Sequence, residues 1–146
     1  MIDAVKSQDG SFTAYSKEYD EHYHSTRDGA LGESLNKHVI PALNHVKERS
    51  EITILDICFG LGFNTLATLY YLHVNHINKK VTIVSPELDG ALVKGLKDFE
   101  YPDVFKPYLH VVEAISNRHE YQDDNLHVNV IVGDARAYLQ TTNEQF

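Results

Sequence analysis

One segment near the middle of the chain constrains the fold more than any other. The run Ile52-Thr-Ile-Leu-Asp-Ile-Cys58 is apolar and rich in β-branched residues, and Phe59-Gly60-Leu61-Gly62-Phe63-Asn64 follows it. This pattern predicts a buried strand, a glycine turn and a helix whose cap is Asn64 or Thr65. Glycines there let the backbone turn sharply and approach a ligand, next to the free N–H groups of a helix start. A plain turn between strand and helix is the alternative.

Further strands and helices are expected on both sides of this segment. Apolar residues at three- or four-residue steps from Leu31 predict a helix, which Pro41 should kink or divide in two. The expected elements are a helix over 32–48, strands over 52–58, 81–85 and 126–132, helices over 64–78 and 89–99, and a helix that begins near 133–136. Residues 101–125 have no clear pattern. Alternating strands and helices predict a parallel sheet with helices on both faces.

Residues 1–30 are expected to be an irregular segment of the same single domain. Asp9-Gly10 and Asp28-Gly29 are typical of turns, and the stretch from Tyr15 to Ser25 is aromatic and polar without periodicity. Loops rich in tyrosine often line ligand sites. We therefore divide the chain into an N-terminal substrate or cofactor loop segment, 1–30, and a cofactor-binding part, 31–146.

The charge of the chain limits how it could bind a nucleic acid. Thirteen Lys and Arg against twenty-one Asp and Glu give a formal net charge of −8, so the surface as a whole cannot hold phosphates. A nucleic-acid role would need a local basic patch or a further region. No apolar run is long enough for a membrane span or a signal peptide, which predicts a soluble, cytoplasmic protein.

Cysteine and histidine do not indicate a metal site. The single cysteine, Cys58, is expected to be a small buried side chain in a reducing cytosol. Two histidine pairs, His22 with His24 and His73 with His76, have no cysteine partner and no His-Glu-x-x-His pattern. No metal is therefore predicted.

Two further acids follow the later strands. Glu87, 25 residues after Gly62, ends the second strand, where a carboxylate can accept the hydroxyl protons of a ribose, and Asp89 could take this role instead. Asp134 ends the last strand and is placed to accept from an adenine amino group. Because ligands bind at the carboxyl ends of the strands in open α/β sheets, the glycine turn and these acids predict an adenosyl pocket. A solvated loop end or a helix cap is the alternative for each acid. Thr65 stands where a dinucleotide fingerprint has its third glycine, which disfavours a nicotinamide cofactor.

These motifs together resemble a known family. Gly-x-Gly, an acid after the second strand, and Gly-Asp-Ala after the third resemble the Rossmann-like S-adenosylmethionine methyltransferases. Asp9-Gly10-Ser11-x-Thr13, Tyr19-Asp20-Glu21-x-Tyr23-His24-Ser25 and Gly29-Ala30-Leu31-x-Glu33-Ser34 narrow the resemblance to the tRNA 5-methylaminomethyl-2-thiouridine methyltransferases, which include MnmC-like proteins. The resemblance implies that S-adenosyl-L-methionine is the cofactor and that tRNA is the partner, methylated at the aminomethyl group of the wobble uridine.

The resemblance also implies roles for individual residues. Around the cofactor it places eight: Asp56, Gly60, Gly62 and Asn64 at the methionine end, Glu87 with Leu88 at the ribose, and Asp134 with Ala135 at the adenine. Near the reacting amine or the sulfonium it places Tyr23, Ser25 and Glu33. Asp20, Tyr23 and Glu33 are the candidate catalytic residues, although Tyr23 could instead pack against a sheet edge.

The sequence departs from the family in one respect. The family has an Asp-x-Phe-x-Pro motif after a fourth strand, and none follows Asp134 here. This predicts that the chain is part of a longer protein or is completed by another chain. We expect an exposed sheet edge after 126–132 that favours self-association, and no measurable tRNA methylation by the chain alone. A non-catalytic adenosyl-binding module and a methyl- or aminopropyltransferase for another amine are the alternatives.

Overall fold

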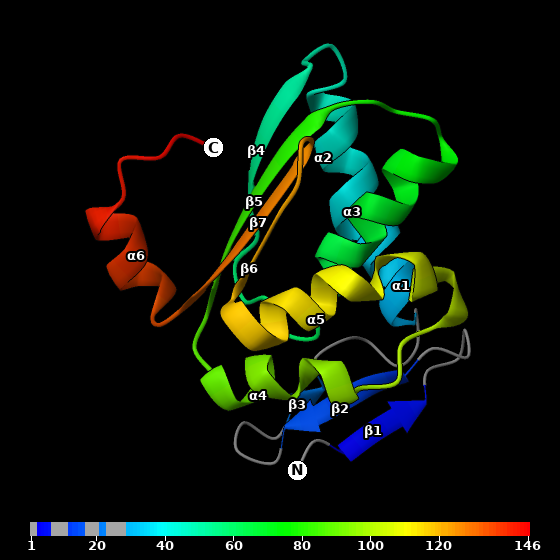
Figure 1. Cartoon of the computed structure of the whole chain (residues 1–146), viewed down its shortest axis with the longest axis vertical. Helices are drawn as coiled ribbons and strands as arrows, with labels where there is room; N and C mark the ends of the chain where they lie inside the picture. The colour runs from blue at the N-terminus through cyan, green and yellow to red at the C-terminus, as the bar shows by residue number, and fades with distance from the viewer. Residues whose placement is uncertain (1–2, 7–11, 17–20, 23–28) are drawn as a thin grey trace.

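A computed structural model describes residues 3–6, 12–16, 21–22 and 29–146, and a four-stranded sheet forms its centre (Figure 1). The strands, in spatial order, are β4 (Glu51–Leu55), β5 (Lys80–Glu87), β7 (Leu126–Val132) and β6 (Glu120–Gln122). Strands β4, β5 and β7 are parallel, and β6 is antiparallel to β7. The predicted α/β class is confirmed, with one antiparallel strand that the sequence did not predict.

Helices lie on both sides of this sheet, as expected. Figure 1 shows α2, α3 and α5 on one side and α6 on the other. The helices are α1 (Ala30–Glu33), the π-helical turn η1 (Ser34–Val39), α2 (Ile40–His45), α3 (Phe63–Val74), α4 (Gly90–Gly95), the 3₁₀ turns η2 (Leu96–Asp98) and η3 (Asp103–Tyr108), α5 (Leu109–Arg118) and α6 (Ala135–Thr141).

The core lies between the sheet and the helices on one of its faces. Val81 and Ile83 of β5 and Val128 of β7 are buried with Leu66 of α3 and Ile115 of α5. Each such side chain stabilises the fold by about 1.5–3 kcal/mol relative to an exposed one. The apolar strands that the sequence predicted therefore hold the carboxyl ends of β4, β5 and β7 in fixed positions.

The predicted helix over 32–48 is interrupted by a wide turn. In η1 the N–H of Ile40 donates to the carbonyl of Leu35, five residues back. Pro41 follows at the start of α2, where its missing N–H costs little. An ordinary α-helix would press the proline ring against the carbonyl four residues earlier, and the wide turn avoids this clash. The prediction that Pro41 divides the helix is confirmed.

One prediction about local structure was wrong, and one segment for which no structure was predicted contains regular elements. Residues 1–30 are not wholly irregular, because β1 (Asp3–Lys6), β2 (Phe12–Ser16) and β3 (Glu21–His22) form an antiparallel sheet. Residues 101–125, which had no clear pattern, contain α5 and β6.

The exposed edge was also predicted on the wrong strand. Strand β7 is interior, with β5 on one side and β6 on the other, whereas β4 is paired only with β5 among the described strands. Asp56 donates to Val84, and Ser50 accepts from Lys80, so the even-numbered residues of β4 bond to β5. In a parallel pair the intervening residues point their backbone groups the other way. The N–H and C=O of Thr53 therefore face the open edge.

Replacing Thr53 by proline should reduce any self-association through this edge. The substitution removes an N–H that the ladder to β5 does not use, so an edge strand should tolerate it. Sedimentation over a range of protein concentrations measures the fraction of dimer, with Thr53→Val as the matched variant that keeps the N–H. Equal dimer fractions in the two variants would place the contact elsewhere.

Candidate adenosyl site at the glycine loop

The glycine loop, residues 56–62, runs alongside the end of β5 before α3 begins. The N–H of Cys58 donates to the carbonyl of Pro86 at 3.0 Å, and the Ser85 hydroxyl donates to the carbonyl of Asp56. Cys58, Gly60 and Gly62 have φ angles of 67°, 56° and 74°. Three left-handed residues in so short a loop give it a shape that few sequences adopt without strain.

Gly62 is required by a neighbouring side chain. A Cβ at this position would lie 2.8 Å from two carbon atoms of the Phe59 ring, and the φ angle of 74° disfavours any side chain. The Phe59 side chain, which is 4% exposed, thus fills the space beside Gly62. We expected this glycine to leave room for a ligand, and the structure gives it a packing role.

Glu87 fastens the loop to the end of β5. Its Oε2 accepts from the N–H of Gly60 at 2.8 Å, and its Oε1 accepts from the N–H of Asp89 at 2.9 Å. The residue is 7% exposed, so both bonds are shielded from water. A carboxylate has about four acceptor positions, and two therefore remain for donors such as ribose hydroxyls. The ribose role of Glu87 stays a prediction, but its contact with the glycine loop is clear.

Asp56 and Asn64 form a second polar pair at the start of the loop. The amide of Asn64 donates to Oδ1 of Asp56 at 2.8 Å. Asn64 therefore does not cap α3, as the sequence predicted for Asn64 or Thr65, because Gly62 occupies the cap position and no side chain caps the helix. The Asn64 side chain instead fixes the orientation of the carboxylate.

A cavity of about 380 Å³ lies beside this pair, between η1, α2, β4 and α3. Asp56, Asn64 and Thr65 line it, and Oδ2 of Asp56, Oδ1 of Asn64 and Oγ1 of Thr65 are buried without a hydrogen-bond partner. Buried polar atoms are normally paired, so these three acceptors fit a ligand or water that brings donors. Lys37 and His38 of η1 also line the cavity.

Burial raises the pKa of the Asp56 carboxyl from 3.8 to about 6, partly offset by the Asn64 hydrogen bond and the nearby His38. The folded state therefore holds this proton more tightly than the unfolded chain does. Stability from this group should fall by about 3 kcal/mol at most as pH rises from about 4 to 7. We expect Asp56→Asn, which is neutral at every pH, to flatten the dependence of urea unfolding on pH in this range. An unchanged slope would show that folding does not raise the pKa of Asp56.

The third predicted acid, Asp134, has mainly a capping role in the structure. Its Oδ1 accepts from the N–H of Arg136 at 2.7 Å, and its Oδ2 accepts from the Arg136 guanidinium at 2.6 Å. These bonds lower the pKa of Asp134 to about 2. The N–H of Gly133 donates to the Glu87 carbonyl at 2.8 Å, which holds the two strand ends side by side. Asp134 is thus near the Glu87 backbone but already paired.

The remaining predicted residues are less closely connected with the loop. Leu88 is 64% exposed beyond the end of β5, and Ala135 begins α6 at the surface. Glu33 lies in α1 and pairs with Lys37 at 3.2 Å. The structure brings together Asp56, Gly60, Gly62, Asn64 and Glu87. Asp20, Tyr23 and Ser25 lie outside the described residues.

The prediction that Cys58 is buried was wrong. Its thiol is exposed because the chain has left the strand and adopts a left-handed conformation there. Partial desolvation of the thiol, followed by the charges of Glu87 and Asp56, raises the pKa of Cys58. Among the described residues no three His, Cys, Asp or Glu side chains are grouped as a metal site would need, and no helix there is long and apolar enough to cross a membrane.

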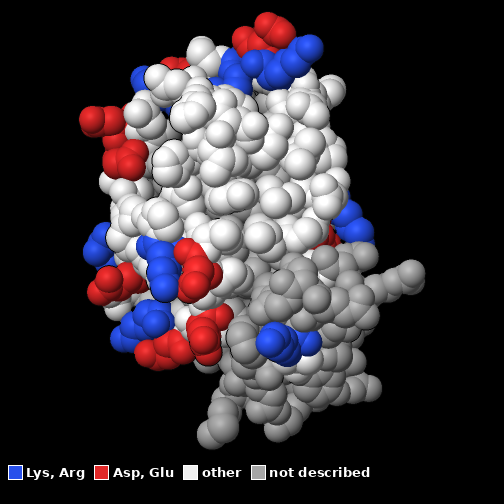
Figure 2. Space-filling view, turned by 90° about the vertical axis from the view of Figure 1, so that its right-hand side faces the viewer, with Lys and Arg blue, Asp and Glu red and all other residues white. Residues whose placement is uncertain are grey.

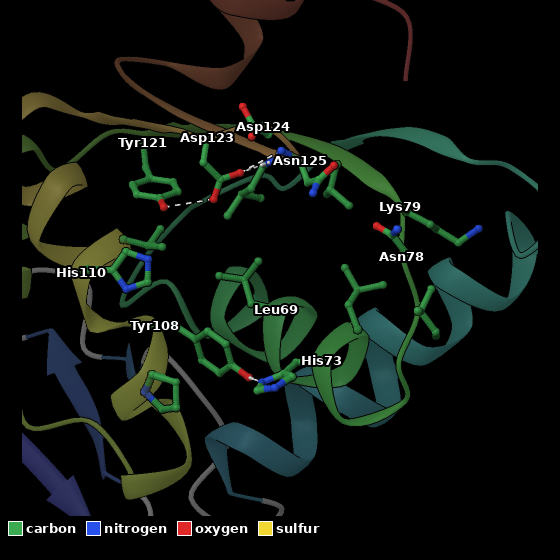
Figure 3. Close-up of a pocket in the computed structure, with 16 residues that line it drawn as sticks. Leu69, His73, Asn78, Lys79, Tyr108, His110, Tyr121, Asp123, Asp124 and Asn125 are labelled. Carbon is green, nitrogen blue, oxygen red and sulfur yellow. Dashed lines mark hydrogen bonds between the residues drawn. The ribbon is translucent and has the colours of Figure 1, made fainter.

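A larger cavity, of about 660 Å³, lies at the opposite ends of the strands (Figure 3). Two pairs of its polar side chains are hydrogen-bonded to each other. Tyr108 is hydrogen-bonded to His73 at 2.6 Å, and Tyr121 donates to Asp123, which also accepts from the N–H groups of Asn125 and Leu126. Because open α/β sheets bind ligands at the carboxyl ends of their strands, and this cavity lies at the amino ends, we place the candidate site at the smaller cavity and the glycine loop.

Sequence reasoning did not identify two residues that hold the loop. Ser85 is fully buried in β5 and donates to the Asp56 carbonyl. Tyr101 donates to the Leu61 carbonyl at 2.9 Å from a segment without a predicted structure. A polar residue within the apolar strand Val81–Ser85 was the available signal for Ser85. No local signal marks Tyr101, since its partner is 40 residues away.

Comparison with solved structures relates this geometry to a family. The chain matches a crystal structure of MnmC2 from Aquifex aeolicus over 100% of its length, with a TM-score of 0.78 and 36% sequence identity. This full-length similarity supports an MnmC-like family for the chain. The Rossmann-like methyltransferase fold expected of this MnmC-like chain is confirmed by the same match.

The MnmC-like chain also matches a curated protein. It is 27% identical to the uncharacterized protein MJ0670 of Methanocaldococcus jannaschii over 144 residues, or 97% of its own length. It spans 38% of that archaeal protein and 46% of the Aquifex MnmC2 chain, that is, less than half of each. No protein-family model matches it.

Proposed function

We propose that this chain is the S-adenosylmethionine-binding part of a methyltransferase that acts on the aminomethyl group of the wobble uridine in tRNA. The observation that carries the proposal is the meeting of Asp56, Gly60 and Glu87 at the carboxyl ends of β4 and β5 in a chain that matches MnmC2 throughout. Open α/β sheets bind nucleotides at such strand ends.

The polar groups at this edge suit the two ends of S-adenosylmethionine. The unpartnered oxygens of Asp56, Asn64 and Thr65 can accept from an ammonium group such as that of the methionine end. Glu87 keeps acceptor positions for the ribose, as its side chain lies between the loop and β5. Asp134 could reach an adenine amino group only through acceptor positions that Arg136 leaves free.

When bound, the cofactor supplies an electrophilic methyl group on its sulfonium. The residues described here would bind and orient it, since correct alignment of two reactants contributes roughly 7–11 kcal/mol to lowering a barrier. An amine must be neutral to attack, so a group that accepts its proton is also needed. Asp20 and Tyr23, outside the described residues, and Glu33 in α1 remain the candidates.

Contact with tRNA would have to be local. Figure 2 shows one face whose middle is covered by uncharged side chains, while acidic and basic groups lie interspersed at the top and along the left side of the view. Helix α3, with the sequence FNTLATLYYLHV, has no charged residue. This face therefore has no basic patch among the described residues, and phosphate contacts of this chain should be made elsewhere.

Titration calorimetry with S-adenosylmethionine and S-adenosylhomocysteine tests the proposal, followed by label transfer to tRNA that has the aminomethyl group. We expect binding of both ligands. Binding without transfer, while a full-length relative is active, would favour a non-catalytic adenosyl-binding role for the isolated chain. Transfer to a different amine would correct the substrate, and absence of binding would reject the proposal.

A further inference from the structure

Four aromatic rings lie directly beneath the glycine loop. The Phe63 ring, in the first turn of α3, is 5.5 Å from the Phe105 ring, 6.0 Å from Tyr101 and 6.5 Å from Phe99, measured between centroids. Phe99 and Tyr101 are edge to face at 4.9 Å. Phe63 and Phe105 are fully buried. Edge-to-face ring pairs stabilise a core beyond the area they bury, so this cluster holds its position beside the loop.

Tyr101 has the one polar atom that this cluster directs at the loop. Its hydroxyl donates to the Leu61 carbonyl at 2.9 Å, and Leu61, between the two glycines, is fully buried. Burial raises the pKa of Tyr101, so the hydroxyl keeps its proton, and its capacity to donate, throughout the physiological pH range. Without this donor, a buried carbonyl at the turn would have no partner from that side.

The loop is therefore held from two directions. From β5, the Glu87 carboxylate accepts from the Gly60 N–H at 2.8 Å, and from residues 99–105 the Tyr101 hydroxyl reaches the Leu61 carbonyl. The two groups belong to peptides on either side of the Gly60–Leu61 peptide, in a loop with left-handed residues at 60 and 62. A backbone segment with left-handed residues adopts other conformations unless neighbouring groups hold it in place.

We propose that Tyr101 is a positioning residue that fixes the glycine loop in its ligand-binding shape through the hydrogen bond to Leu61. The inference rests on the proposed function, since it concerns the same adenosyl site. Tyr101 does not contact the ligand in this proposal. It acts by removing the ordering cost that a loose loop would add to binding.

The test compares Tyr101→Phe with Tyr108→Phe. The first keeps the ring cluster and removes only the hydroxyl, and the second removes a tyrosine hydroxyl that is bonded to His73 in the other cavity. We expect Tyr101→Phe to weaken S-adenosylmethionine binding roughly threefold to tenfold in calorimetry, and Tyr108→Phe to leave it unchanged. Binding is measured well below both unfolding temperatures, so a loss of stability alone would not change the affinity.

Amide hydrogen exchange of residues 58–62 separates this inference from the proposed function. Faster exchange there in Tyr101→Phe, but not in Tyr108→Phe, supports the positioning role even if the parent chain does not bind the cofactor. If the parent binds the cofactor, equal affinity in Tyr101→Phe would overturn it, and equal loop exchange in parent and variant would overturn it whether or not the parent binds. Should Tyr101→Phe not fold, Phe99→Leu loosens the ring that packs against Tyr101 and should increase loop exchange. A loop unaffected by Phe99→Leu would then also overturn the inference.

Discussion

Replacing Gly62 by valine should abolish cofactor binding and lower the free energy of unfolding by about 2–4 kcal/mol. The left-handed backbone at position 62 disfavours any side chain, and the added Cβ would lie 2.8 Å from the Phe59 ring. This clash cannot be relieved without moving a buried aromatic side chain. Urea unfolding measures the stability and calorimetry the binding.

Gly32→Val is the matched control for this substitution. A Cβ at Gly32 meets nothing within 4 Å, and the residue lies in helix α1. We expect little change in stability from it. If Gly62→Val bound no cofactor but unfolded at the same urea concentration as the parent chain, the glycine would be needed only for ligand space, as the sequence alone suggested.

Replacing Glu87 by alanine should have the second largest effect. It leaves the N–H groups of Gly60 and Asp89 without their acceptor in a buried site, at a cost of about 1–3 kcal/mol in stability for a lost partner. If ribose hydroxyls are left unpaired, the free energy of S-adenosylmethionine binding should also become less favourable by about 1–3 kcal/mol. Both the unfolding midpoint and the dissociation constant should therefore change.

Two variants make this result specific. Glu87→Gln keeps one acceptor oxygen and should lose less stability than Glu87→Ala. Glu120→Ala removes an exposed acid on β6 that is paired with His127, and it should leave binding unaltered. Unchanged affinity in Glu87→Ala would remove Glu87 from the adenosyl pocket.

The sequence predicted the central strands and the helix after the glycine turn because their patterns are local. Apolar β-branched runs mark β4, β5 and β7, and the glycines mark the turn at the end of β4. The acid at the end of β5 was found for the same reason. Parallel strands place their carboxyl ends at one edge of the sheet, so Asp56 and Glu87 were expected close together. In the structure Asp56 begins the glycine loop and Glu87 is bonded to it.

Other features depend on contacts that are distant in the sequence. Helix α5 begins with Leu109-His-Val-Val112, which resembles a strand, and two prolines precede it, at positions 102 and 107. Strand β6 has only three residues and exists because β7 offers an edge to pair with. The role of Asp134 depends on Arg136. The guanidinium of Arg136 donates to the carboxylate that we expected to accept from an adenine amino group. Tertiary contacts decide each of these cases.

The wide turn η1 changes the helical phase of the segment before β4. The buried positions Ala30, Ser34, Val39 and Leu43 are spaced by four, five and four residues, so one extra residue is taken up inside the turn. One residue corresponds to about 100° of rotation in an α-helix. If residues 30–45 instead formed an evenly wound α-helix with every residue kept, Val39 and Leu43 would be rotated out of the core, whereas deleting one residue from η1 would restore four-residue steps and keep them facing it. The irregular turn is what lets both halves of this helix present their apolar sides to the same interior.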